Sequence, residues 1–169
     1  MAEVTIAMIK ELREATGAGV MDAKRALEEA EGDAKRATAI LREKGAAAAA
    51  KRADRETKNG VVANYIHLGG RIGVLVELNC ETDFVANTED FRALANLIAM
   101  QVAAMNPLVV AIEDRTAEME GAPNEEVVLL SQPYIRESSR SIADLIKDVV
   151  AKTGENIRVR RFVRFELGR

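Results

Sequence analysis

Residues 72–87, IGVLVELNCETDFVAN, combine the clearest strand pattern of this 169-residue chain with an unusual connector. Four apolar residues alternate with their neighbours at the two-residue period of a sheet face: Ile72, Val74, Val76 and Leu78. This alternation ends before a helical period begins, so residues 79–87 are predicted to form a connector at the end of a strand. Connectors run over the surface and often carry binding residues.

Phe84 is the unusual member of this connector. A bulky apolar side chain at the end of a sheet has no assured core to enter, and beside Asp83 it has the character of a probe for another molecule. The alternative is that Phe84 folds back and packs on the helix that follows. Spacing alone leaves both interpretations open.

The composition favours helices and a protein partner. Apolar residues make up 48 % of the chain and aromatic residues only 4 %, so alanine and small aliphatic side chains supply the packing. The net charge of −3 differs from the basic character of proteins whose main ligand is a phosphate backbone. We therefore expect a protein partner and no direct contact with nucleic acid.

The sequence has no feature of secretion or membrane insertion. No charged start precedes an apolar run, and no segment approaches the roughly 20 apolar residues of a membrane span. A cytoplasmic location and no membrane contact are therefore expected. Cys80 is the only cysteine, which excludes an intrachain disulfide and a multi-cysteine metal site.

Residues 1–45 have the pattern of three short amphipathic helices. Thr5 and Asp33 are the predicted N-caps of the first and third helices, while Gly32 and Gly45 are predicted to end the second and third. The residues predicted to face inward are Ile6, Ile9, Leu12, Ala23, Ala26, Leu27, Ala30, Ala37, Ile40 and Leu41. A bundle of about 45 residues would be marginally stable by itself.

Residues 46–59 are predicted to form a helical or semi-rigid linker, because an alanine run precedes a charged stretch without an apolar stripe. Four basic residues there could contact nucleic acid: Lys51, Arg52, Arg55 and Lys58. Asp54 and Glu56 dilute this charge, and no aromatic residue is interleaved for base stacking. We therefore expect a solvated linker that offers little to anchor it.

Residues 60–169 are predicted to form a two-layer α/β sandwich with a mostly antiparallel sheet, so the whole chain has an α+β class. A hairpin turn is expected at Gly69-Gly70, a helix capped by Thr88 after it, and a second helix ending near Gly154. A short strand is expected at 108–112 and, at 113–126, an exposed loop that could contain a helical turn. Val62, Ile66 and Leu68 are assigned to one face of the first strand. In the last strand one face is assigned to Ile157, Val159, Val163, Phe165 and Leu167.

The usual catalytic constellations are missing from the sequence. It contains no Walker loop, no G-x-S-x-G elbow and no H-E-x-x-H motif. His67 and Cys80 could be a base and a thiol on opposed strands, but no third group is placed to orient them. Asp83 and its acidic neighbours lack the ligand spacing of a calcium loop. A non-enzymatic protein without cofactor or metal is therefore expected.

Three separated motifs resemble the bacterial elongation factor Ts family. They are LREATGAGVMDAKRAL at 12–27, TDFVA at 82–86, and a carboxyl-terminal pair, LSQPY at 130–134 with GENIRVRRF at 154–162. The resemblance covers nearly the whole chain and corresponds to the short form of the family with a single core. It implies that residues 1–45 are similar to a ubiquitin-associated three-helix bundle.

The resemblance also implies a function. Proteins of this family promote nucleotide exchange on elongation factor Tu by binding its GDP form, perturbing its Mg²⁺ site and releasing GDP. The residues implied to enter the G domain of elongation factor Tu and displace its Mg²⁺ are Thr82, Asp83, Phe84 and Val85. The helical module is implied to dock on the same domain through Leu12, Arg13, Val20 and Met21. His67 is implied as a second contact, with an exposed hairpin histidine as the alternative.

Two departures from the family pattern add to these expectations. Longer relatives carry a duplicated core, whereas residues 60–169 hold one copy, so a homodimer is expected. The segment 113–126 is too short for a further helical segment that the family often has. Two other functions remain open: an adaptor whose three-helix module binds a peptide or ubiquitin-like surface, and RNA binding through the arginines of 158–164.

Overall fold

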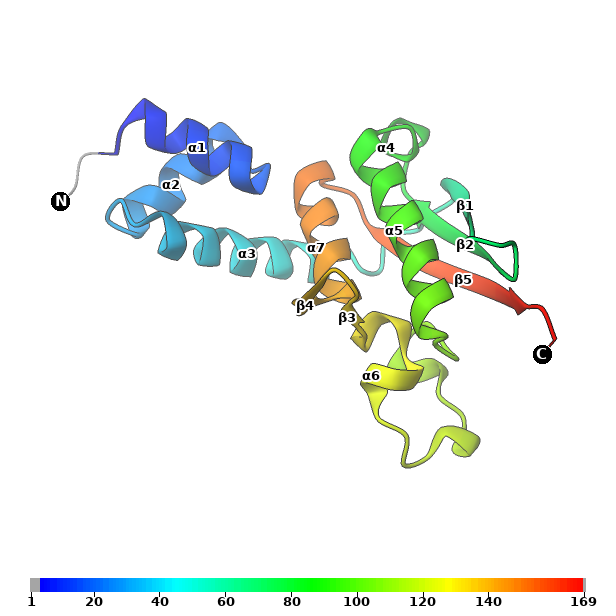
Figure 1. The fold of residues 1–169 in the computed structure, drawn as a ribbon. Coiled ribbons are helices and arrows are strands. Elements are labelled where there is room, and N and C mark those ends of the chain that lie inside the picture. Colours follow the sequence, from blue (N-terminus) through cyan, green and yellow to red (C-terminus); the bar gives the residue numbers. More distant parts are fainter. Residues whose placement is uncertain (1–3, 169) are drawn as a thin grey trace.

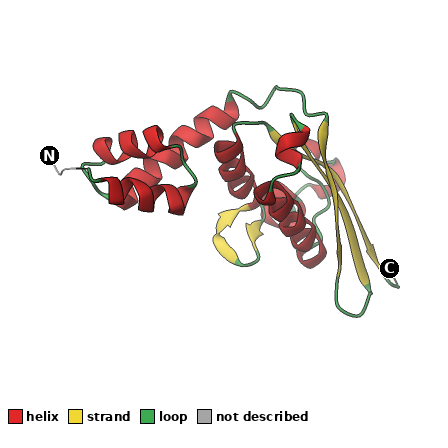
Figure 2. Ribbon diagram, turned by 90° about the horizontal axis from the view of Figure 1, so that it is seen from above, coloured by secondary structure: helices red, strands yellow, loops and turns green. Residues whose placement is uncertain are grey.

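The computed structural model describes residues 4–168, with a helical part and an α+β part (Figure 1). The helical part consists of α1 (Ile6–Thr16), α2 (Val20–Glu29) and α3 (Ala34–Ala50). The sheet is antiparallel with the order β1-β2-β5 and consists of β1 (Asn59–Ile66), β2 (Ile72–Cys80) and β5 (Ile157–Glu166). The long helices on its one covered face are α5 (Glu89–Met105) and α7 (Ile142–Thr153), as Figure 2 shows. The predicted α+β class and antiparallel sheet are confirmed.

The first three helices begin as their caps predict. The Thr5 hydroxyl accepts a hydrogen bond from Met8 N at 3.3 Å, and Asp33 caps α3 in the same way. The residues enclosed by these helices are Leu12, Ala23, Ala26, Leu27, Ala30 and Ala37. Ile6, predicted to face inward, is 86 % exposed. The apolar stripe of α1 instead runs through Met8 and Leu12, and Ile6 precedes Met8 by about 200° of helix rotation.

Helix α3 does not end at Gly45 as predicted but continues to Ala50. The following alanines have the highest helix propensity, and together they outweigh the cost of about 1 kcal/mol for one interior glycine. The end of α3 packs on α7, where a Cβ atom at Gly45 would lie 3.1 Å from the Ala151 Cβ. Ala49 packs against the core of the α+β part. The start of the predicted linker is therefore anchored to the core.

Strand β1 turns Ala63 toward the helices, with Val61 and Tyr65 packed beside it. Ala63 pairs with Val76 across the sheet, and paired residues point to the same face. Val62 and Ile66, predicted to share one face with Leu68, therefore do share a face, but it is the uncovered one. Leu68 lies beyond the end of β1 and is 90 % exposed.

Strand β5 changes face at a β-bulge opposite the step from Glu77 to Leu78. Before the bulge Ile157 faces the helices; beyond it Phe162 packs against the core, and Phe165 is 68 % exposed. The prediction of a single apolar face along the last strand is wrong, because the extra residue shifts the two-residue period by one. Inside are Ile157 and Val159; outside are Val163, Phe165 and Leu167.

The connection from α5 to α7 is built from short elements. In chain order these are η1 (Ile112–Asp114), η2 (Ala117–Met119), α6 (Asn124–Val127), η3 (Leu129–Ser131), β3 (Pro133–Tyr134) and β4 (Glu137–Ser141). The prediction of a strand at 108–112 is wrong. Residues 108–112 form no strand, and Val109 makes an isolated β-bridge with Val128 instead. The β3-β4 hairpin is a feature that the sequence analysis does not predict.

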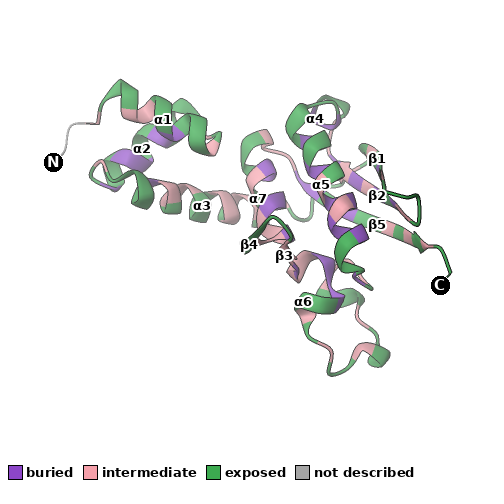
Figure 3. Ribbon diagram, in the orientation of Figure 1, coloured by how far each residue is buried: buried purple, intermediate pink, exposed green. Residues whose placement is uncertain are grey.

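The main core lies between the sheet and its covering helices, as the buried residues in Figure 3 show. Phe91, Ile98 and Leu78 are fully buried there. Helix α5 starts at the predicted cap, where the Thr88 hydroxyl accepts a hydrogen bond from Phe91 N at 3.3 Å. Helix α7 ends at Gly154 with a φ of 74°, a left-handed conformation that favours glycine.

Candidate partner-binding site

The connector after β2 contains a one-turn helix, α4 (Asp83–Ala86), at one end of the sheet (Figure 1). Thr82 is its N-cap, and the Thr82 hydroxyl accepts a hydrogen bond from Val85 N at 3.4 Å. At the other end, the Asn87 side chain donates to Asp83 O at 2.9 Å. The carboxylate of Asp83 lies in the first turn, where the peptide dipoles favour negative charge.

This turn separates its side chains between the core and the surface. Val85 is 9 % exposed and belongs to the main core, together with the neighbouring Ala86. Phe84 is 82 % exposed. The alternative that Phe84 folds back on the next helix is therefore wrong, because Val85 takes the inward position. A large aromatic ring stands free at the tip of a turn whose base is held in place.

The base of the turn is held by Glu155, in the connector between α7 and β5. Its carboxylate accepts hydrogen bonds from Glu81 N at 3.1 Å, Thr82 N at 3.0 Å and the Thr82 hydroxyl at 2.6 Å. The side chain of Asn156, 5 % exposed, donates to Ala53 O and Arg55 O. Three segments far apart in the sequence therefore meet below Phe84.

Cys80 ends β2 beside this network and is fully buried. Its thiol donates to Thr82 O at 3.1 Å. Burial, with the charge of Glu155 as the next contribution, raises the pKa of the Cys80 thiol to about 11. The group is therefore a protonated, structural thiol at neutral pH, consistent with a small residue at a strand end.

His67 lies at the hairpin turn, at the other end of β1 and β2 from Thr82. The length of β2 separates the two ends by about 25 Å. The idea of a thiol and base pair is wrong, because Cys80 pairs with Asn59 at the far end of the hairpin. The His67 ring is exposed, and its Nδ1 lies 3.2 Å from the Tyr65 hydroxyl.

The four predicted docking residues of the helical part are divided by burial. At the start of α2, Val20 is 50 % exposed and Met21 is 57 % exposed. Arg13 is exposed as well. Leu12 is only 4 % exposed and packs in the core of the bundle. Leu12 therefore supports this surface from below, and a direct contact to a partner through its side chain is not available in this conformation.

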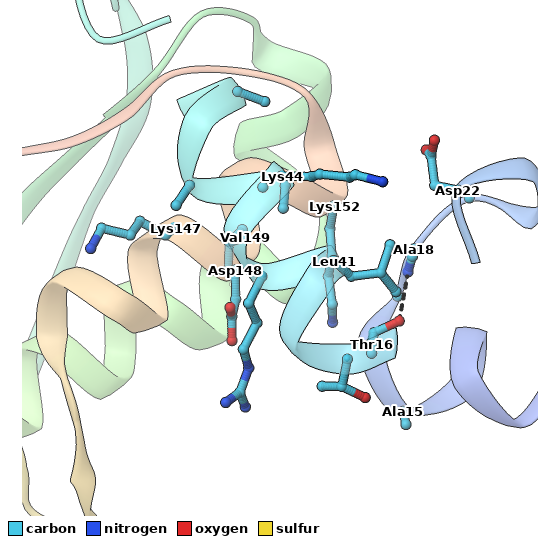
Figure 4. Close-up of a pocket in the computed structure, with 18 of the residues that line it drawn as sticks. Ala15, Thr16, Ala18, Asp22, Leu41, Lys44, Lys147, Asp148, Val149 and Lys152 are labelled. Atoms are coloured by element: carbon cyan, nitrogen blue, oxygen red, sulfur yellow. Dashed lines mark hydrogen bonds between the residues drawn. The ribbon is translucent and has the colours of Figure 1, made fainter. Parts of the chain in front are cut away.

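A cleft of about 640 Å³ lies between the helical part and α7 (Figure 4). The aliphatic part of the Lys152 side chain packs against Gly17. A Cβ atom at position 17 would lie 2.5 Å from the Lys152 Cε. The Lys152 ammonium pairs with Asp90 of α5 at 3.2 Å, and Lys147 pairs with Asp144 at 3.1 Å. We interpret the cleft as the seam along which the three-helix part rests on the core.

The arginines of β5 are mostly engaged within the chain. Arg161 pairs with Glu77 at 2.8 Å, and Arg160 lies 3.8 Å from the same carboxylate. Arg164 pairs with Glu166 at 2.8 Å and donates to Ala103 O. This neutralisation weakens the hypothesis of an RNA-binding arginine face.

Comparison with known proteins identifies the family. A family model described as Elongation factor TS matches residues 2–122. The chain belongs to the elongation factor Ts family. It is 49 % identical to Elongation factor Ts of Desulforamulus reducens, over 99 % of this chain and 91 % of that protein. It is 51 % identical to the protein of that name from Carboxydothermus hydrogenoformans (98 % and 89 %) and 48 % to that from Thermotoga maritima (98 % and 97 %).

The family membership makes the chain a translation elongation factor, as the resemblance of its motifs predicts. The alignment with the Desulforamulus reducens protein spans 197 positions, more than the 169 residues of this chain, so that relative has residues without a counterpart here. Across residues 4–168, no helix combines the length and the apolar character needed to cross a membrane. The same residues contain no cluster of three His, Cys, Asp or Glu side chains able to hold a metal ion.

Two features around the site were not predicted from the sequence. The first is the role of Glu155 and Asn156, which lie within a family motif; their position just after the αL residue Gly154 is the local signal. The second is the apolar outer face of the sheet, where Ile66, Leu75 and Phe165 are exposed. The signal there is the absence of any helix between β1 and β2 that could cover this face.

Proposed function

We propose that this chain promotes release of GDP from elongation factor Tu through the Thr82–Val85 turn, with Phe84 as the wedge. The observation that carries the proposal is the 82 % exposure of Phe84 on a turn whose neighbour Val85 is anchored in the core. An exposed aromatic on a fixed base can enter a partner without unfolding its own support. Asp83 adds a carboxylate next to the ring.

The proposed mechanism uses the geometry that Mg²⁺ demands. The ion requires near-ideal octahedral coordination and bridges phosphate oxygens to protein ligands, so small displacements of those ligands weaken it. A protein that binds the nucleotide-free form better than the GDP form must weaken GDP by the same factor. Each tenfold of this coupling corresponds to about 1.4 kcal/mol. Phe84 would shift packed elements of the partner. The Asp83 carboxylate would be a hydrogen-bond acceptor or a repulsive charge near the metal.

We propose that the exchange involves no bond-making or bond-breaking by this chain and no cofactor of its own. The chain would consist of a docking module at 1–45, a connecting segment at 46–59 and an exchange core at 60–169.

The surface of the module that contacts the partner would be formed by Arg13, Val20 and Met21, with Leu12 beneath them. His67 would be a second contact at the hairpin end. A cytoplasmic location follows from the partner.

We also propose that the chain acts as a homodimer through the outer face of its sheet. Ile66 and Phe165 both pair with Gly73, so their side chains flank a position without one. Leu75 pairs directly with Val163 in the same face. These residues form an exposed apolar patch, bordered on the same face by Asn64 and the Glu77–Arg161 pair. Exposed apolar patches of this kind mark interfaces, and a two-fold contact requires a self-complementary patch.

The decisive experiment is the substitution Phe84→Ala. We expect the variant to remain folded and to lose most of its exchange activity, since truncation of a central aromatic anchor costs about 2 kcal/mol or more. That corresponds to a roughly 30-fold loss or more. The measurement is stopped-flow release of a fluorescent GDP from elongation factor Tu.

Ile112→Ala is the matched control, because Ile112 is another exposed apolar residue away from the turn. GDP release at the wild-type rate with Phe84→Ala would show that the wedge role is wrong. If the wild-type chain itself left GDP release unchanged, the adaptor function of the three-helix module would take its place.

A further inference from the structure

The Phe84 turn is not held by its own helix alone. A helix of one turn has too few internal hydrogen bonds to be stable by itself. Its N-cap, Thr82, both accepts from Val85 N and donates its hydroxyl proton to Glu155, at 2.6 Å. The rotamer of the cap is therefore selected by a residue 73 positions away in the sequence.

Glu155 is well suited to this contact because it is an ionised acceptor with two oxygens. One oxygen accepts from two successive backbone amides, Glu81 N and Thr82 N, while the other accepts from the Thr82 hydroxyl. Hydrogen bonds to a charged acceptor are about twice as strong as neutral ones. The carboxylate thus fixes both the backbone direction at the base of the turn and the side chain that caps it.

The platform that carries Glu155 is itself fixed. The backbone amide of Asn156 donates to the Glu81 carboxylate at 2.7 Å, and the Asn156 side chain holds the carbonyls of Ala53 and Arg55. Arg55 also pairs with Glu81 at 3.5 Å, and Asn59 donates to Glu81 O at 2.8 Å. The base of the Phe84 turn is thereby joined to the segment that leads back to the three-helix part.

We infer that Glu155 is a positioning residue for nucleotide exchange, which orients the Phe84 turn without contacting the partner. This inference rests on the proposed wedge role of Phe84. Glu155 follows the end of α7, is partly buried, and makes its hydrogen bonds to Glu81 and Thr82 at the base of the turn, whereas the Phe84 side chain is largely exposed. Its effect on exchange would therefore be indirect, through the direction in which Phe84 is presented.

The test is Glu155→Gln in the full chain. The matched control is Glu118→Gln, at an exposed carboxylate of η2 that has no partner among residues 4–168. The amide keeps the size of the side chain but loses the charge and one acceptor. We expect the maximum rate of GDP release from elongation factor Tu to fall about tenfold. The concentration giving half of that rate should change much less, because the docking surface on α1 and α2 is untouched.

A second readout separates loosening of the turn from general loss of structure. Amide hydrogen exchange should become faster at residues 81–85 in Glu155→Gln and stay at the wild-type rate in the centre of β2. If Glu155→Gln fails to fold, Glu155→Asp keeps the charge but shortens the reach, and it should show the same two effects.

A double-mutant cycle tests whether Glu155 acts through Phe84. In a Phe84→Ala background, Glu155→Gln should add little further loss, because the side chain that it positions is gone. Full additivity of the two losses would overturn the inference, as would wild-type exchange by Glu155→Gln. If Phe84→Ala alone exchanges at the wild-type rate, the wedge function fails; if Phe84→Ala is slow and Glu155→Gln is not, only the positioning role fails.

Discussion

At the scale of single residues, the neighbours Phe84 and Val85 show how one turn assigns opposite roles to two similar side chains. Both are apolar and both lie in α4, yet Val85 belongs to the core and Phe84 is exposed. Consecutive residues of a helix point about 100° apart, so a single turn against a core can bury one and must release the other. The sequence alone leaves this choice open because the helix is too short to display a period.

Cys80 provides a pH-dependent prediction at the same scale. The pKa of its thiol is about 11 in the folded chain, against an ordinary value of 9.0. The buried thiol therefore contributes stability that is fully present below pH 9 and is lost as the pH rises toward 11. As the pH rises from about 9 toward 11, we expect the urea denaturation midpoint to fall more steeply in wild type than in Cys80→Ala. Urea titrations at several pH values give the comparison; equal slopes in both proteins would contradict it.

At the scale of elements, two local expectations fail because packing overrides them. α3 runs through Gly45, since the glycine allows a close approach to Ala151 of α7. In β5 a bulge moves Phe162 to the covered face, where it packs on the core. At Gly45 the sequence carries two opposed signals, because a glycine usually predicts a helix end while the alanine run after it favours helix. A bulge has the same composition as a strand and leaves no mark of its own.

The α3–α7 contact leads to a prediction with an internal control. Gly45→Leu should push α3 away from α7 and destabilise the chain by about 1–3 kcal/mol, the usual cost of overpacking. Ala47→Leu adds the same side chain two residues later in α3, at an exposed position, and should be nearly neutral. Chemical denaturation of both variants measures the difference. Similar stability of the two would mean that the contact at Gly45 contributes little.

At the scale of the whole molecule, the three proposed contact regions lie far apart. In Figure 1, α1 and α2 lie at one end of the molecule, the β1–β2 hairpin lies toward the other end, and α4 lies between them. His67 is in the turn of that hairpin. A partner that touches all of them must extend along the chain, so their relative placement matters. That placement is supported by the packing of Gly17 on the Lys152 side chain, by the contact of Gly45 with Ala151, and by the Asn156 bonds to Ala53 and Arg55.

The outer sheet face gives a prediction about assembly. The wild-type chain should sediment as a dimer at micromolar concentration, and Phe165→Glu should sediment as a folded monomer, because a charge on each copy would be buried in the contact. Leu108→Glu, at an exposed residue outside the sheet, should remain dimeric. A wild-type monomer with full exchange activity would remove the homodimer from the mechanism, and a dimeric Phe165→Glu would move the interface elsewhere.

Local chemistry determined much of this protein from its sequence. The caps Thr5, Asp33 and Thr88 and the helix end at Gly154 depend on bonds to residues a few positions away. The family could be recognised for the same reason, since its motifs are continuous stretches of chain. The α+β class also followed, because the periods of helix and strand are local properties.

Only the tertiary structure decided which faces and contacts carry the function. The covered face of β1 depends on pairing with β2, and that of β5 depends on a bulge. The exposure of Phe84 depends on Val85 reaching the core, and the hold on its turn depends on Glu155, 73 residues from Thr82. These features arise from segments that meet only after folding, and no period or spacing along the chain encodes such a meeting.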